Sequence, residues 1–117
     1  MRLPRRSRPH YLKYKEAARA LVRARLLALN AHYQAPVKKV FIKNLKSRWG
    51  SCSERGNLNF NYRILFLPLP VADYIIAHEL CHLREFNHSP KFWALVAQTI
   101  PNYKDVRRAL RALERQS

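Results

Sequence analysis

Apolar side chains recur with helical spacing near the start of the chain. From about Tyr11 to Tyr33 the sequence contains no Gly or Pro and is rich in Ala, Leu, Arg and Lys, which favour helices. The apolar residues of this segment fall on one side of a helix, and most charged residues fall on the other. The pattern predicts an amphipathic first helix in which Arg25 lies on the apolar side.

Between residues 37 and 62 the spacing changes to the two-residue period of β-strands. Residues 37–43 are rich in β-branched side chains, and residues 58–62 alternate between apolar side chains and asparagines. Gly56-Asn57 is a turn signal between two short extended runs. We therefore expect a small antiparallel sheet of three strands.

Two details of this expected sheet bear on chemistry. Gly50 lies inside a strand pattern, which indicates a bulge or a close approach of another group to the backbone. Asn59 and Asn61 share one face of an edge-like strand, and such a strand can hold an extended peptide by strand addition. Exposed polar side chains beside a turn are the alternative interpretation.

Three further helices are predicted downstream of the sheet. Pro70 fits the first turn of one helix, and Ser89-Pro90 is an N-cap followed by a first-position proline for the next. Pro101-Asn102 ends that helix, and a last helix is expected from about Tyr103 to Arg115. Helices that follow a small antiparallel sheet indicate an α+β fold.

The helix that begins near Pro70 contains His-Glu-Leu-Cys-His at residues 78–82. Residues four apart on a helix lie one above the other, so His78 and His82 can offer imidazole nitrogens to one point. They would be two ligands of a tetrahedral zinc site. Glu79 lies about 100° around the helix from His78, where it can take a proton from water on the metal.

His88 follows His82 by six residues and completes the spacing H-x3-H-x5-H. Three protein ligands with an open fourth position are typical of catalytic zinc. We therefore expect one Zn²⁺ per chain, held by His78, His82 and His88, with Glu79 as the general base. The apolar flanks of the motif predict a buried helix, in which hydrogen-bonded core histidines and an ion-paired glutamate are the alternative.

The length of 117 residues indicates a single domain. Residues 1–9 are expected to form a basic, flexible arm, because Pro4 and Pro9 oppose a regular helix there, and residues 10–117 the folded domain. Two cysteines do not make a disulfide framework, no apolar run reaches the ~18 residues of a membrane span, and no secretory signal is present. A cytoplasmic protein is expected.

The charge is strongly positive, with 23 Lys and Arg against 7 Asp and Glu, or +16 net. This excess favours an acidic partner such as nucleic acid or a nucleotide, although a solvated surface without a specific target gives the same composition. Arg48 is a candidate substrate-binding residue, together with Asn59 and Asn61. Its guanidinium can hold a phosphate or a peptide carboxylate, or form a structural salt bridge to Glu85 or Asp73.

Several segments together form a distinctive combination. They are Arg48-Trp49-Gly50-Ser51-Cys52-Ser53, Asn61, residues 73–83, Asn87-His88-Ser89 and Phe92-Trp93. From about residue 10 to residue 113 the chain resembles the YgjP-like metal-dependent hydrolases, which are grouped with SprT-like and other zincin metallopeptidases. The resemblance implies a zincin-like α+β fold, zinc on the three histidines and Glu79 as the base.

The sequence also departs from related patterns. Members of the resembling family commonly carry a further N-terminal region, so this chain looks like a minimal catalytic module. The histidine spacing equals that of metzincins, but Glu85 stands where those have Gly, and Met1 is the only methionine. The route from the helix end to His88 must therefore turn without a glycine.

Three classes of function remain at this point. The first is a zinc metallopeptidase that acts on a peptide or protein. The second is a zinc-dependent nucleoside triphosphate pyrophosphohydrolase, an activity that has been attributed to relatives. The third is a non-enzymatic, basic nucleic-acid-binding module with a structural metal, against which Glu79 and the three-ligand set argue. Nonspecific nucleic-acid contact through the basic surface is compatible with each class, and no membrane partner is expected.

Overall fold

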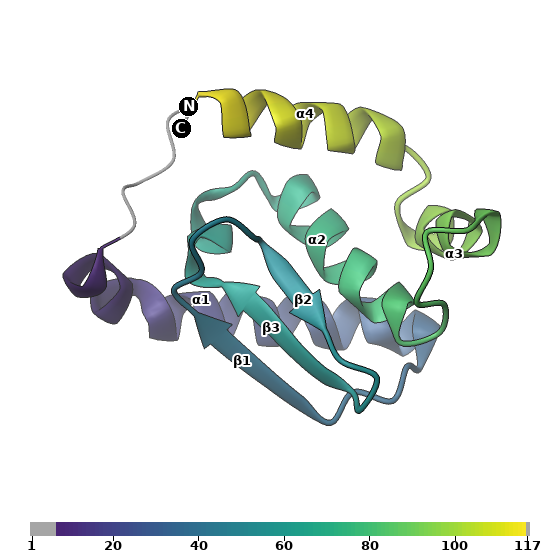
Figure 1. Ribbon diagram of the computed structural model, residues 1–117, viewed down its shortest axis with the longest axis horizontal. Helices are drawn as coiled ribbons and strands as arrows, with labels where there is room; N and C mark the ends of the chain where they lie inside the picture. Colours follow the sequence, from purple (N-terminus) through teal and green to yellow (C-terminus); the bar gives the residue numbers. More distant parts are fainter. Residues whose placement is uncertain (1–6, 117) are drawn as a thin grey trace.

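The computed structural model describes residues 7–116, which form helices packed around one small sheet (Figure 1). In chain order the elements are α1 (Arg8–Tyr33), β1 (Lys39–Lys43), β2 (Gly50–Cys52), β3 (Asn57–Asn61), the 3₁₀ helix η1 (Tyr62–Phe66), α2 (Leu69–His82), α3 (Pro90–Thr99) and α4 (Tyr103–Arg115). The predicted α+β class is confirmed, and α4 has the predicted bounds. None of the described helices is both long and apolar enough to cross a membrane.

Helix α1 begins three residues earlier than predicted. The Ser7 hydroxyl caps it by accepting a hydrogen bond from the His10 amide at 3.2 Å. Pro9 lies in the first turn, where an N–H group has no partner within the helix and its absence is tolerated. Residues 8 and 9 of the predicted arm therefore belong to α1, and residues 1–6 lie outside the described residues.

The three strands form a mixed sheet in the order β1-β3-β2, so the prediction of a fully antiparallel sheet is wrong. β2 and β3 form the predicted antiparallel hairpin, but β1 pairs with β3 in parallel, with Lys39 opposite Asn57. Residues 44–56, which include β2, connect the two parallel strands and are long enough for that crossover. β3 is thus the central strand, and Asn59 and Asn61 do not lie on an edge.

The hairpin turn depends on Gly56. Its φ of +91° is a conformation that side-chain-bearing residues rarely adopt. A Cβ atom there would lie 2.5 Å from the carbonyl oxygen of Pro36. The Gly56 carbonyl in turn accepts a hydrogen bond from the Lys38 amide at 2.8 Å, which fixes the entry to β1 beside the turn.

Helix α2 lies at the centre of the molecule in Figure 1, with α4 above it and the sheet and α1 below it. Most of its residues are buried, as the apolar flanks of its motif predict. An ion pair explains why Arg25 lies on the apolar side of α1. Its guanidinium donates two hydrogen bonds, of 2.8 and 3.0 Å, to the Asp73 carboxylate of α2. This two-point ion pair fixes α2 relative to α1.

Replacement of Gly56 by alanine should destabilise the fold without touching the candidate site. We expect the free energy of unfolding to fall by roughly 1–3 kcal/mol, because the new Cβ meets the Pro36 carbonyl at a strained φ. Urea unfolding measures this loss. Glu54→Ala, an exposed position in the same turn, is the control and should change stability by less than about 0.5 kcal/mol.

Candidate metal centre

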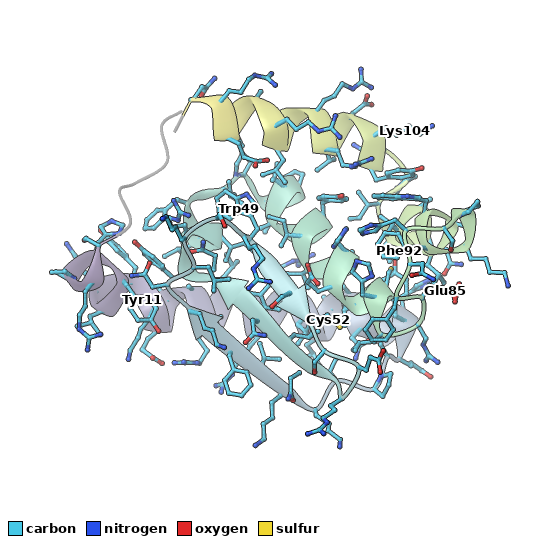
Figure 2. All side chains as sticks on the ribbon, in the orientation of Figure 1. Tyr11, Trp49, Cys52, Glu85, Phe92 and Lys104 are labelled. Carbon is cyan, nitrogen blue, oxygen red and sulfur yellow. The ribbon has the colours of Figure 1, made fainter. Side chains whose placement is uncertain are left out.

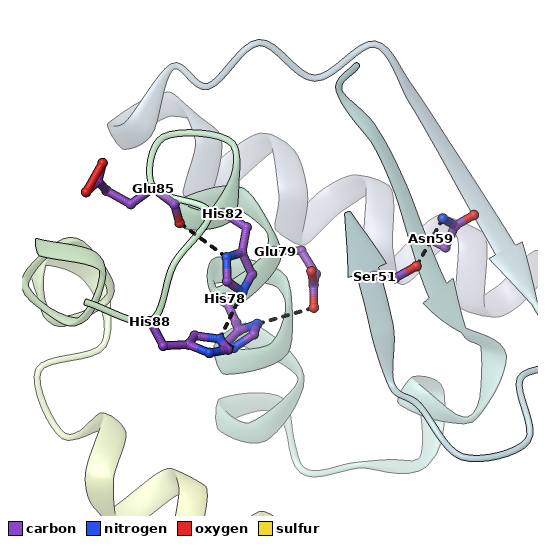
Figure 3. A network of polar contacts seen from close by, with 7 residues as sticks. All are labelled: Ser51, Asn59, His78, Glu79, His82, Glu85 and His88. Atoms are coloured by element: carbon purple, nitrogen blue, oxygen red, sulfur yellow. Dashed lines mark hydrogen bonds and ion pairs between the residues drawn. The ribbon is translucent and has the colours of Figure 1, made fainter. Parts of the chain in front are cut away.

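Three histidine side chains converge at the end of α2 (Figure 3). His78 and His82 lie one turn apart on the helix, and His88 reaches them from the segment before α3. The Nε2 atom of His88 lies 3.0 Å from Nε2 of His82 and 3.2 Å from Nε2 of His78. The ligand atoms of the three residues all lie within 4.8 Å of one another, so they could hold one metal ion.

The second ring nitrogen of each α2 histidine has its own acceptor. Nδ1 of His82 lies 3.2 Å from the backbone oxygen of Glu85, and Nδ1 of His78 lies 3.3 Å from Oε2 of Glu79. Because carbonyl and carboxylate oxygens accept hydrogen bonds, both contacts favour a ring proton on Nδ1. Each Nε2 then presents a lone pair toward the cluster, as metal ligation requires.

The surroundings of His82 and His88 favour their neutral rings. Burial lowers the pKa of His82 and of His88, and the charge of neighbouring His78 lowers both further. A neutral imidazole is the form that binds metals. Cys81 is fully buried, burial raises the pKa of its thiol to about 11, and its sulfur is not part of the converging group of ligand atoms.

The turn from α2 to His88 is made without a left-handed residue. Among the described non-glycine residues, only Gln34 has a positive φ. Amides of Arg84 and Glu85 instead donate to the carbonyl of Cys81, which continues the helical path for a few residues. The Arg84 guanidinium then donates to the carbonyls of Tyr33 and Gln34 at 3.1 and 2.7 Å, which ties this turn to the end of α1.

Helix α3 supplies the packing that holds the rings together. Phe92, which is labelled in Figure 2, is fully buried. Its ring centroid lies 4.5 to 5.1 Å from those of all three histidines. Trp93 stacks on His88 at 5.7 Å and on Tyr103 of α4 at 5.1 Å. The pattern of α3 predicts Phe92 as an inward residue, but only the packing of α3 against α2 shows that it contacts the histidines.

Glu79 lies between the histidine cluster and the sheet. It is the one acidic residue buried among residues 7–116, with 6% of its surface exposed. Gly50 of β2 makes room for it: a Cβ at that position would lie 3.2 Å from Cγ and 3.3 Å from Oε2 of Glu79. The predicted close approach at Gly50 is therefore confirmed, and the approaching groups are the Glu79 side chain and the Asn59 carbonyl.

Asn59 and Asn61, the two asparagines predicted to bind substrate, are not part of the histidine cluster. Asn59 and Asn61 alternate along β3 with the inward-facing Leu58 and Phe60, so they lie on the opposite face of the sheet. Asn61 is fully buried, and its amide donates to the carbonyls of Leu45 and Arg48 at 3.0 and 2.9 Å. Its side chain therefore positions the segment that leads into β2.

Asn59 donates to the Ser51 hydroxyl at 3.1 Å, on the far side of β2 from Glu79 in Figure 3. Arg48, by contrast, lines a cavity beside the cluster, together with Trp49, Gly50, Tyr74, Ile75, His78, Glu79 and Leu110. Of the three predicted substrate-binding side chains, only Arg48 thus lies beside Glu79 and His78. Asp73, one of its predicted partners, pairs with Arg25 instead.

Comparisons with known proteins agree with this architecture. The family model described as YgjP-like, metallopeptidase domain matches residues 7–113. The metallopeptidase zymogen abylysin of Pyrococcus abyssi is 31% identical, with a TM-score of 0.70 over 80% of this chain and 95% of that chain. Jannalysin of Methanocaldococcus jannaschii, also a metallopeptidase zymogen, shares the fold at 20% identity, with a TM-score of 0.61 over 81% and 94% of the two chains.

None of the curated proteins matches the sequence significantly. The family match nevertheless spans almost all described residues, and the fold is that of zincin-like metallopeptidases. A metallopeptidase domain works with a metal ion, and the described structure has a three-histidine cluster that suits one. The protein is a metallohydrolase, and the chain belongs to the YgjP-like metallopeptidase-domain family.

Proposed function

We propose that the protein is a zinc-dependent peptidase in which His78, His82 and His88 hold one Zn²⁺. The observation that carries this proposal is the convergence of the three Nε2 atoms. Two ligands of a tetrahedral zinc ion with Zn–N bonds of about 2.0–2.1 Å lie roughly 3.3 Å apart. The separations of 3.0 and 3.2 Å at His88 are close to that value. Zinc bound there would supply Lewis acidity toward water and the scissile carbonyl.

Glu79 is proposed as the general base. It follows the first histidine of the cluster, and its carboxylate is buried beside that ring rather than paired with Arg or Lys. It takes a proton from the attacking water and passes it to the leaving nitrogen, so that the peptide bond breaks into a carboxylate and an amine. The buried position removes competing solvent from the carboxylate.

Peptides are the proposed substrates, since the family and abylysin are both described as metallopeptidases. β2 is an edge strand of the described sheet and passes directly beside Glu79 at Gly50. An extended peptide could pair with it, the role that the sequence suggested for the strand with Asn59. Arg48 is the proposed substrate-binding side chain, because this residue lines the cavity beside Glu79 and carries a guanidinium that can bind a carboxylate.

Removal of one histidine should abolish tight metal binding. We expect the purified protein to hold one zinc per chain. Loss of a group that only hydrogen-bonds a metal ligand weakens metal binding by roughly 10–100-fold, and His88→Ala should weaken zinc binding by more than that. Elemental analysis and competition with a chelating dye measure this. His32→Ala, which removes a ring bonded to Gln98, is the control. Unchanged zinc affinity in His88→Ala would exclude His88 as a ligand.

Glu79→Gln should stop hydrolysis while zinc stays bound. The amide cannot accept the proton, so the rate should fall by about 10²–10⁴-fold on an unfolded protein substrate. Glu85→Gln is the matched control, because the Glu85 carboxylate points away from the cluster in Figure 3 and only its backbone contacts His82. The same assay with nucleoside triphosphates tests the alternative: turnover of these and not of protein would refute the peptidase proposal.

Gly50→Ala tests the position of Glu79 without removing it. The new Cβ would meet the Asn59 carbonyl at 3.0 Å and Glu79 Cγ at 3.2 Å, so the carboxylate must shift by a few tenths of an ångström. We expect the turnover number to fall roughly tenfold or more with zinc content unchanged, because small displacements of a reacting group reduce the rate strongly. Wild-type turnover in a folded Gly50→Ala variant would contradict the proposed role of Glu79.

A further inference from the structure

The cavity beside Glu79 is built from three separate parts of the chain. It has a volume of about 230 Å³, and its walls come from the segment entering β2, from α2 and from α4. Because His78 and Glu79 form one wall, a group in the cavity lies directly next to the proposed reacting centre. The cavity is therefore placed to receive a part of the substrate adjacent to the bond that breaks.

Most of the other walls are apolar or aromatic. They are formed by Trp49, Tyr74, Ile75 and Leu110. Ile75 and Tyr74 are buried residues of α2, and burial raises the pKa of the Tyr74 hydroxyl. Such walls favour an apolar side chain over a polar one, because a polar group would lose its hydration there without new hydrogen bonds.

One arginine lines this apolar cavity, and two more on α4 act on its Tyr74 wall. Arg48 is exposed, lines the cavity and forms no ion pair with any acidic residue in the part of the chain that the structure describes. On the α4 side, the charges of Arg107 and Arg111 act on Tyr74 and oppose the effect of burial on its pKa. The only acidic residue in the lining is Glu79. A carboxylate on the ligand would complement this arrangement.

We propose that this cavity is a specificity pocket that takes a large apolar side chain next to the scissile bond, with an adjacent carboxylate of the substrate held by Arg48. The assignment rests on the proposed peptidase function. The carboxylate has two sources, the C-terminus of a peptide or an Asp or Glu side chain beside the apolar residue. Leu110 makes α4 part of the pocket, so α4 contributes to substrate choice.

Binding to metal-free protein tests the pocket independently of catalysis. N-acetylphenylalanine and its amide are titrated by NMR in the presence of a chelator. We expect the acid to bind roughly tenfold more tightly than the amide, and Arg48→Ala to remove that difference. Arg55 is an exposed arginine in the β2–β3 turn that does not line the cavity, so Arg55→Ala should retain the tighter binding of the acid. Equal binding of acid and amide, or a preference that survives Arg48→Ala, overturns the assignment.

Cleavage by the zinc-loaded protein identifies the source of the carboxylate. Matched peptides carry phenylalanine at a free C-terminus, at an amidated C-terminus, or internally before Glu or before Gln. Preference for the free C-terminus over the amide, or for Glu over Gln, supports the pocket and names the source. Absence of both preferences overturns it. If no peptide is cleaved although acid binding depends on Arg48, the peptidase proposal fails and the pocket assignment stands as a carboxylate site.

Leu110→Trp tests the apolar part of the pocket. The larger side chain fills the cavity, so cleavage at phenylalanine should fall roughly tenfold while cleavage at alanine in the same peptide is retained. The change in this ratio separates loss of the pocket from loss of folding, which would reduce both rates together. A ratio equal to that of the wild type in the folded variant overturns the proposed role of Leu110.

Discussion

Three imidazole rings have to be held close together although neutral rings turn Nε2 lone pairs toward one another and two protonated rings would repel. α2 fixes two of them by helical spacing, and the Arg84 side chain ties the turn before His88 to the end of α1. The Phe92 ring packs against all three. The cluster is therefore preorganised by packing and hydrogen bonds that do not involve a metal, and the rest of the fold serves to place those groups.

Glu79 shows how the sheet contributes to the same centre. The carboxylate lies against β2 at the one strand position without a side chain, Gly50. Asn61 holds the segment before β2 through two backbone carbonyls, and Arg25 with Asp73 holds α2 against α1. These contacts lie outside the histidine cluster, yet together they determine the distance between the carboxylate and the rings.

The fold class, the hairpin and the helices follow from local signals such as turn glycines, caps and apolar spacing, and the histidine spacing alone predicts convergence on α2. The parallel pairing of β1 does not follow, because alternation along a strand is the same in parallel and antiparallel sheets. The sequence pattern also does not predict that Leu110 and Tyr74 line the cavity. Their role depends on how α4 docks on α2, and periodicity shows which side of a helix is apolar but not its neighbour.

The cavity beside Glu79 joins residues that are far apart in the sequence, since Leu110 is needed to complete a wall that begins at Arg48. The three histidines, by contrast, all lie between residues 78 and 88, on α2 and in the segment before α3. Substitutions in α4 can therefore reshape one wall of the cavity without replacing any residue of the histidine cluster, so the two parts of the centre can diverge independently.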